Sequence, residues 1–349
     1  MSQRRRPTQV DIAHAAGVSQ ATVSLVISGG HASGQVAEHT RAAVLDAATK
    51  LGYTVNTAAR SLKGGRNKML GLYAFEPVFP VDQRDFYFPF LLGVEGATAD
   101  FGYDLLLFSS VSSGERRIYS DGINRLKVAD GCVLLGRHID RSDLADLVNE
   151  GFPFVFIGRR ELPGVELSYV APDYVGATRD MVVRLTDLGH RRLAYLRPAD
   201  QQEPTRDREA GFRAGVDEAG LPEQAVHEMP DDASDAEARL AALLERWLAD
   251  GVTAVLIDPL EDDRTIAALE RVAAEAGLRI PEDLSVAVLG GPMPSGPGGR
   301  DWTRFTLPRE EMGRAAVALL LEILDDDTGP RRLSVACTAV DGDSVGRPR

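Results

Sequence analysis

From Met69 onward, short apolar runs alternate with longer amphipathic segments, and this alternation limits the possible folds more than any other feature. Such alternation predicts parallel sheets with helices on both faces, and ligands bind such sheets at the carboxyl ends of the strands. The length of this region predicts two lobes rather than one. We expect strands near Leu70–Phe75, Asp104–Ser109, Gly131–Leu135, Phe154–Ile157, Arg192–Arg197, Ala254–Ile257 and Ser285–Leu289. The helices expected between them include Phe90–Phe101, Tyr174–Leu188, Ala236–Asp250 and Arg264–Ala276.

The N-terminal residues follow a different, all-helical pattern that includes the stretch "DIAHAAGVSQATVSLVISGG". Thr8 is placed to cap a first helix that ends at Gly17, and Ser19 is placed to cap a second helix running to about Ile27. A third helix is expected from roughly Ala37 to Leu51. Two short helices joined by a glycine-containing turn are typical of the helix-turn-helix, whose second helix can lie in the major groove of DNA. The residues expected to pack this head are Val10, Ile12, Ala13, Ala16, Val18, Ala21, Val23, Val26, Ile27, Val44, Ala47, Ala48 and Leu51.

Charge is distributed unevenly along the chain. Residues 1–68 carry nine Lys or Arg and three Asp or Glu, a net charge of +6, whereas the whole chain carries −13. The remainder therefore carries −19. A basic head on an acidic body indicates that the head alone meets a polyanion. The alternative is a solvated basic tail without function, which the interleaving of basic residues with a helical pattern disfavours.

The composition argues against a membrane protein and a disulfide-bonded secreted protein. No run of eighteen apolar residues occurs, and no apolar segment of the secretory type follows the basic start "MSQRRRPTQV". Cys132 and Cys337 stand in apolar runs without metal-ligand spacing, which indicates buried thiols. We expect a cytoplasmic protein with no cofactor, no metal and no membrane contact.

Three blocks in order carry a specific resemblance: "DIAHAAGVSQATVSLVISG", "VAEHTRAAVLDAATKLGY" and "NTAARSLKGG". They resemble the head of the LacI/GalR family of transcriptional regulators. The resemblance implies a sequence-specific DNA-binding regulator, expected to be a homodimeric repressor that binds double-stranded operator DNA with dyad symmetry. It divides the chain into a helix-turn-helix domain at 1–55, a hinge helix and linker at 56–68, and an effector-binding and dimerisation domain at 69–349.

The resemblance also implies roles for individual residues of the head. Gln20, Ala21 and Leu25 match positions that read base edges, where Gln can pair with adenine through two hydrogen bonds and Ala and Leu offer only apolar contact. Residues suited to phosphate contacts, which set position rather than sequence, are Thr8, Ser19, Thr22, Ser24, Thr40 and Arg41.

The block "NTAARSLKGG" matches the hinge helix, which in the family folds on DNA. Leu62 matches the leucine that wedges into the minor groove and kinks the duplex. Asn56, Ala59 and Lys63 are further contacts expected in this segment. The alternative is a plain linker that contains a leucine by chance.

The family pattern extends over the body through "DLGHRRLAYL", "REAGFRAGVDEAGL", "GLRIPEDLSV" and "PREEMGRAAVALLLEIL". It implies two lobes like those of periplasmic binding proteins, with a small-molecule effector, a sugar or related polar metabolite, in the cleft between them. The N-lobe is expected at about 69–167 plus 302–328, and the C-lobe at about 168–301 plus 329–349. The expected effector contacts are Phe86, Tyr87, Ser109, Arg159, Arg208 and Asp258. Core packing is the alternative for Phe86 and Tyr87, and a surface ion pair is the alternative for Arg208.

Two segments depart from the family pattern. After the strand at 254–257 the chain reads "IDPLEDD", so that Asp258 follows the strand directly. The segment "LGGPMPSGPGG" lacks the acidic residue that binds a sugar hydroxyl in relatives. A modified or anionic effector, or a regulator without any effector, therefore stands beside a standard sugar.

Two other classes of protein are alternatives to a regulator. A solute-binding protein with similar lobes would need a secretion signal and no DNA-binding head. An enzyme would need a catalytic cluster, and the sequence shows no HExxH, GxSxG, Walker or CxxC motif. His190, in "LGHRR", is expected to be structural rather than a catalytic base. We therefore expect a regulator and not an enzyme.

Overall fold

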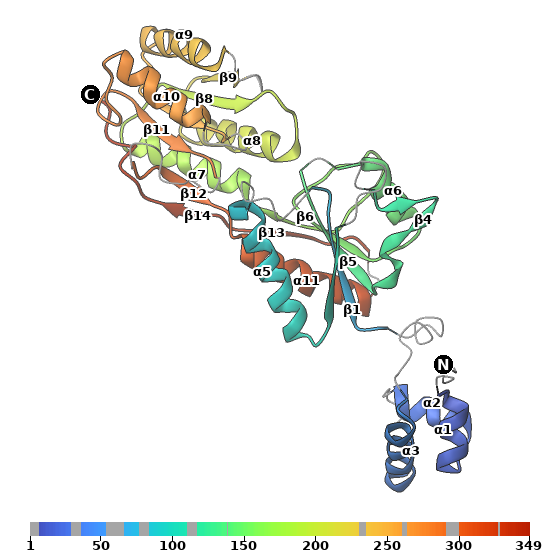
Figure 1. Cartoon of the computed structure of the whole chain (residues 1–349). Coiled ribbons are helices and arrows are strands. Elements are labelled where there is room, and N and C mark those ends of the chain that lie inside the picture. Colours follow the sequence, from blue (N-terminus) through green and yellow to red (C-terminus); the bar gives the residue numbers. More distant parts are fainter. Residues whose placement is uncertain are drawn as a thin grey trace, which may run out of the picture. The chain divides into compact units, whose positions relative to one another are not determined.

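The fold is that of a computed structural model, which describes residues 7–28, 36–53, 66–76, 84–109, 117–137, 139–229, 235–259, 264–290, 300–326 and 329–349. The chain forms two compact units, Met1–Lys68 and Met69–Arg349. The first unit is helical and the second is an α/β body, as Figure 1 shows. The predicted hinge residues Asn56, Ala59, Leu62 and Lys63 lie outside the described residues.

Three helices build the head: α1 (Gln9–Ala16), α2 (Gln20–Ser28) and α3 (Glu38–Leu51). Thr8 caps α1 through a reciprocal capping box with Asp11, and Gly17 ends it in the left-handed conformation at φ 66°. The axes of α1 and α2, taken to Ile27, bend by 107°, an angle typical of a helix-turn-helix. This local geometry agrees with the sequence prediction.

A small apolar core holds these helices together, with Ile12, Val23 and Val44 fully buried at its centre. Three residues predicted to pack there do not. Ala21 is exposed on α2. Val10 is 57% exposed because it lies two residues before Ile12, almost on the opposite side of α1. Leu51, the last residue of α3, is 38% exposed. The periodicity therefore predicted the centre of the core but overestimated its extent.

The body contains two six-stranded sheets. The first has the order β13-β7-β6-β5-β1-β2, and all its neighbouring strands are parallel. Its strands are β1 (Met69–Ala74), β2 (Asp104–Phe108), β5 (Gly131–Leu135), β6 (Phe154–Ile157), β7 (Tyr169–Pro172) and β13 (Arg332–Val335). Alternate residues of β1 point to opposite faces, so that Leu70 and Leu72 enter one core and Tyr73 enters another.

The second sheet has the order β14-β12-β11-β10-β8-β9, and only the pair β12–β14 is antiparallel. Its strands are β8 (Leu193–Pro198), β9 (Ala225–Met229), β10 (Ala254–Ile257), β11 (Ser285–Val288), β12 (Thr303–Thr306) and β14 (Thr338–Val340). We call the first sheet with its helices the first lobe and the second sheet with its helices the second lobe. The predicted architecture, parallel sheets covered on both faces, is confirmed.

Helices cover both sheets. In the first lobe these are α5 (Arg84–Asp100), α6 (Arg141–Asn149) and α11 (Arg309–Asp325), with a short 3₁₀ helix η3 (Arg125–Val128) and a small hairpin of β3 (Tyr119–Ser120) and β4 (Ile123–Asn124). Figure 1 shows α5 and α11 side by side. In the second lobe they are α7 (Tyr174–Asp187), α8 (Glu203–Glu218), α9 (Ala236–Ala249) and α10 (Arg264–Glu275). Among the described residues, no single helix is long and apolar enough to cross a membrane; only α1 and α2, taken together across their bend, reach that composition.

The lobe boundaries differ from those predicted, because three strands belong to the other sheet. β12 lies in the second sheet although 302–328 was assigned to the first lobe, since Phe305 packs into the second lobe's core. β7 and β13 lie in the first sheet, where Val170 and Val335 pack. The chain thus crosses between lobes three times, after β7, after β12 and after β13.

Candidate functional site

One face of α2 is free of the head's core. Gln20 and Ala21 are exposed, Leu25 is 37% exposed and Ser24 is half-buried, whereas Val23 and Val26 point inward. Ser24 lies four positions after Gln20, and Leu25 lies four positions after Ala21, so each pair is stacked along one side of the helix and the two pairs are adjacent. The predicted base-reading residues therefore lie on the same outward side of α2.

Several residues predicted to contact phosphate also have local roles. The Ser19 hydroxyl accepts a hydrogen bond from the Thr22 backbone N–H at 3.1 Å, which caps α2, and the two hydroxyl groups lie 2.9 Å apart. Thr8 caps α1, and the Thr40 hydroxyl lies 3.1 Å from Nε2 of His39. Arg41 is exposed on α3. These groups offer donors at the starts of helices, where a phosphate oxygen is favoured.

In the body, Arg208 and Asp258 are brought together. Arg208 stands on α8, Asp258 follows β10, and both are buried. Arg208 Nη1 lies 3.1 Å from Asp258 Oδ1, and the Tyr195 hydroxyl donates to Asp258 Oδ2 at 3.2 Å. The Arg208 guanidinium also lies 3.9 Å from the centre of the Tyr174 ring. The pair occupies the carboxyl ends of the strands, where parallel sheets bind ligands.

The electrostatics of this pair reflect its burial. Burial raises the pKa of Asp258 to about 6, although Arg208 and Tyr195 oppose the shift. For Arg208, burial would lower the pKa, but Asp258 and the neighbouring tyrosines outweigh it and the pKa rises. The first shift disfavours the ionised pair and the second favours it. A carboxyl with a pKa near 6 is still charged at neutral pH, so the pair is ionised there.

A second arginine that the sequence reasoning missed lies near this pair. Arg309 is the first residue of α11, is 8% exposed, and lies with its guanidinium 5.1 Å from the centre of the Phe86 ring. A signal for it exists in the sequence. Arg309 shares the apolar face of α11 with Met312, Gly313 and Ala316, three, four and seven residues on, where a charge is unusual.

The remaining predicted effector residues have different surroundings. Tyr87 is 2% exposed within the core, and its hydroxyl donates to Glu76, whereas Phe86 is half-buried and contacts Tyr87 and Phe90 edge-to-face. Ser109 is exposed at the end of β2, an edge strand. Arg159 forms ion pairs with Asp207 and Glu161. The structure therefore brings Phe86 to Arg309 and Arg208 to Asp258, and engages Tyr87 and Arg159 elsewhere.

Charged residues hold the two lobes together. Glu203, which is 1% exposed at the start of α8, accepts hydrogen bonds from Arg141 Nη2 at 3.2 Å and from the Glu161 backbone N–H at 3.1 Å. Arg160 Nη1 lies 3.8 Å from the same carboxylate. Arg206 of α8 donates to Glu161 at 2.8 Å. These contacts join the loop after β6 to the first turn of α8, and we call them the interlobe ion-pair network.

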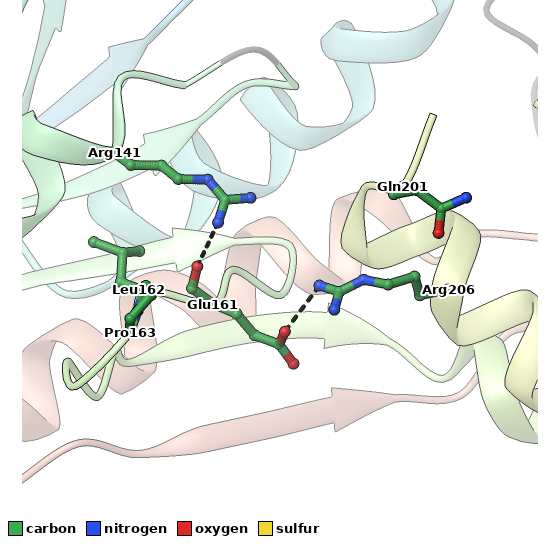
Figure 2. Close-up of a pocket in the computed structure, with 6 residues that line it drawn as sticks. All are labelled: Arg141, Glu161, Leu162, Pro163, Gln201 and Arg206. Atoms are coloured by element: carbon green, nitrogen blue, oxygen red, sulfur yellow. Dashed lines mark hydrogen bonds and ion pairs between the residues drawn. The ribbon is translucent and has the colours of Figure 1, made fainter. Parts of the chain in front are cut away.

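An open pocket of about 540 Å³ lies beside this network. Figure 2 shows the residues that line it. Its lining comes from both lobes: Arg141, Glu161, Leu162, Pro163, Gln201 and Arg206. Arg141 donates to the Glu161 backbone oxygen at 2.8 Å, and Arg206 binds the Glu161 carboxylate, so both guanidinium groups converge on one residue. Because its cations already have partners, this pocket is part of the lobe contact rather than a separate site.

Each of the two units matches a known protein family. Residues 8–56 match the model of bacterial regulatory proteins of the lacI family, and residues 182–345 match the periplasmic binding protein-like domain. The chain is 33% identical over 338 residues to the HTH-type transcriptional regulator CelR of Thermobifida fusca, covering 95% of this chain and 96% of the relative.

Solved structures give the same result. The structure of a CelR–cellobiose complex superposes with a TM-score of 0.60 at 28% identity, covering 97% of this chain and all of that chain. The lac repressor dimer bound to its operator and an anti-inducer superposes with a TM-score of 0.65 at 20% identity, which shows the shared fold over 98% of this chain and all of that one. These relatives are transcriptional regulators and not enzymes. The chain is a member of the lacI family of DNA-binding transcriptional regulators, with a helix-turn-helix head and a two-lobed body.

Proposed function

We propose that this regulator is a cytoplasmic, homodimeric repressor that binds an operator with dyad symmetry and changes its affinity when a small polar ligand binds between the lobes. One observation carries the proposal: α2 presents Gln20, Ala21 and Leu25 outward in a chain whose body has two lobes. Two copies related by a two-fold axis would place their α2 helices on half-sites about one helical turn apart.

Within the head, we assign base contacts to Gln20, Ala21 and Leu25, and phosphate contacts to the hydroxyl groups at the helix starts and to Arg41. Phosphate contacts set register, whereas base-edge contacts set sequence. The hinge residues Asn56, Ala59, Leu62 and Lys63 keep their proposed role in the minor groove, with Leu62 as the wedge.

For the body, we propose that the ligand is carbohydrate-like and that Phe86, Arg208 and Asp258 contact it. The CelR structure is that of a cellobiose complex, which supports this ligand class. Aromatic faces suit sugar rings, and a guanidinium fork suits ligand oxygens. A regulator without an effector is the alternative. It is favoured by the segment "LGGPMPSGPGG", where the acidic residue expected from the family pattern is absent.

The DNA-binding half can be tested by selecting duplexes from a random pool and comparing two variants. Gln20→Ala should relax sequence preference at one position per half-site at a cost of about 1–3 kcal/mol. Arg41→Ala should weaken binding to selected and random duplexes equally and lower the salt slope by about 1. The proposal fails if the selected sites lack an inverted repeat, or if Gln20→Ala leaves the selected sequence unchanged.

A further inference from the structure

Arg309 differs from the other buried arginines of the described chain. Four arginines are less than a tenth exposed: Arg160, Arg197, Arg208 and Arg309. The first three each have a carboxylate within 4 Å, with nearest N–O distances of 3.8, 2.6 and 3.1 Å respectively. In the described part of the chain Arg309 has no such partner, and its Nε and Nη2 atoms make no hydrogen bond.

An unpaired buried guanidinium is costly. Burial lowers the pKa of Arg309, and the positive charge of Arg208 lowers it further. The side chain nevertheless stays protonated at any physiological pH, so its charge must be stabilised by its surroundings. The Phe86 ring supplies a cation–π contact, which offsets part of this cost but satisfies no N–H donor.

The location of Arg309 connects it to ligand control. The three crossovers between lobes carry Tyr174 just after β7, Arg309 just after β12 and Cys337 between β13 and β14. Tyr174 and Cys337 both influence the pKa of Arg309, as does Arg208. Arg309 therefore stands at a crossover between the lobes, close enough to Arg208 for the two charges to interact.

The local charge is positive. Arg208 and Arg309 contribute two positive charges, and Asp258 contributes one negative charge. Arg309 also opens α11, a seventeen-residue helix whose start has no side-chain cap, so the helix dipole adds to the positive potential. The acidic residues of that first turn, Glu310 and Glu311, are exposed to solvent. The carboxylate of Asp173, the residue before Tyr174, is used locally, because it accepts a hydrogen bond from the Gly176 backbone N–H at 2.9 Å.

We propose that the ligand held between the lobes carries an anionic oxygen group, a carboxylate or a phosphate, and that Arg309 binds this group together with Arg208. The inference rests on the proposed function, because it specifies the ligand of the same site. An anionic oxygen would satisfy the free Nε and Nη2 donors of Arg309 through charge-assisted hydrogen bonds, which a neutral sugar hydroxyl does only weakly.

The chain beside Arg208 at the end of β11 offers no carboxylate that would repel an anion, because Val288, Leu289 and Gly290 are apolar. Gly290 itself lies against Arg208, since a Cβ there would be 3.4 Å from Nη2. Carbohydrate acids and sugar phosphates combine such a group with the ring that Phe86 would contact.

The test is titration calorimetry of the full-length protein with matched probes: cellobiose, its oxidised form cellobionate, glucose 6-phosphate and inorganic phosphate. The expected result is that cellobionate or glucose 6-phosphate binds about tenfold or more tightly than cellobiose. The better of the two probes identifies the group as a carboxylate or a phosphate.

Variants assign the effect to Arg309. Arg309→Gln should bring the ratio of anionic to neutral affinity close to one, and Arg309→Lys should keep part of it. The control is Arg314→Gln on the same helix, which removes an exposed arginine paired with Asp100 at 2.9 Å and should leave the ratio unchanged. The ligand-free melting temperature of Arg309→Gln should equal or exceed that of the wild type, because a buried unpaired charge is removed.

Several outcomes would overturn the inference. These are equal affinity of the wild type for cellobiose and the anions, an unchanged ratio in Arg309→Gln, a clear loss of ligand-free stability in that variant, or no anionic probe bound below about 10 mM. Operator binding separates this inference from the proposed function. Control of operator affinity by neutral cellobiose would keep the function and reject the anion. A bound anion without any effect on operator affinity would keep the anionic ligand and reject the proposed function.

Discussion

At the residue scale, the second lobe contains a carboxyl whose environment opposes its charge. Asp258 is 2% exposed, and the groups that act on it are Arg208 on α8, Tyr195 on β8, Asp200 and, from the first lobe, Arg137. Burial outweighs the two arginines and raises the pKa from 3.8 to about 6. Asp258 should therefore contribute to the pH dependence of the free energy of unfolding.

The sign of that dependence follows from proton binding. Between pH values of about 4 and 6, the folded protein holds a proton on Asp258 that the unfolded chain has released. Asp258 should therefore make the free energy of unfolding fall as pH rises through this window, by at most about 1.4 kcal/mol per pH unit.

Urea denaturation at several pH values, on wild type, Asp258→Asn and the exposed control Asp250→Asn, measures this slope. Asp258→Asn should lose the part of the pH slope that comes from Asp258, and Asp250→Asn should keep the slope of the wild type. An identical slope in all three proteins would show that Asp258 ionises normally.

Single residues were also the level at which the sequence was least informative. Ile12, Val23 and Val44 were predicted to be core residues and are. The ion pair between Arg208 and Asp258 joins residues fifty positions apart, so spacing could not reveal it, although each was a predicted site residue. Arg309 was missed because it packs against Phe86, which is far from it in the sequence, even though its place on an apolar helix face was visible.

At the element scale, glycines allow pairs of helices to pack closely. A Cβ added to Gly93 of α5 would lie 2.0 Å from the backbone oxygen of Glu310, and one added to Gly313 of α11 would lie 2.5 Å from that of Phe90. Backbone atoms cannot move aside without moving the helix. The contact between α5 and α11 therefore requires glycine at both positions.

Gly93→Ala should destabilise the body by about 1–3 kcal/mol through this overpacking. Gly96→Ala is the matched control on the same helix, because its Cβ would meet only the mobile end of the Arg314 side chain at 2.9 Å. It should be neutral or stabilise by up to about 1 kcal/mol through helix propensity. Thermal denaturation compares the two, and equal stability would contradict the packing argument.

The interlobe ion-pair network gives a second prediction at the element scale. Glu203→Gln removes the buried negative charge that Arg141 and Arg160 face. The loss of this partner should lower the free energy of unfolding by about 3–5 kcal/mol and loosen the contact between the loop after β6 and α8. Hydrogen exchange at residues 159–163 should become faster. Glu209→Gln on the same helix, where Arg197 keeps Glu228, is the control. Unchanged exchange in Glu203→Gln would show that this network does not hold the loop after β6 to α8.

Elements with strong periodicity were predictable. The strands at Gly131–Leu135, Phe154–Ile157 and Ala254–Ile257 have the predicted bounds, because each is a continuous apolar run in a buried parallel sheet. The strands β7, β9, β12, β13 and β14 were not predicted; four of them lie at or next to the edge where the chain crosses between lobes, and β9 is the opposite edge of its sheet. Strand assignment there depends on sheet pairing, which the local pattern does not encode.

At the scale of the whole molecule, charge separates the two units. The head carries +6 and the rest of the chain −19, so DNA should attract one unit and repel the other. If roughly six phosphates are neutralised per site, the logarithm of the association constant should fall with the logarithm of salt concentration with a slope of about −5. Fluorescence anisotropy on the selected operator measures this slope, and a salt-independent affinity would contradict electrostatic binding by the head.

The central claim is that ligand binding in the body controls DNA binding by the head. The most direct measurement is the operator affinity of the full-length protein with and without a saturating ligand from the calorimetric panel, together with ligand affinity with and without operator. We expect the two affinities to change by the same factor, about 5–150-fold, because coupling between binding sites is reciprocal. A ligand that binds the body and leaves operator affinity unchanged would contradict the account.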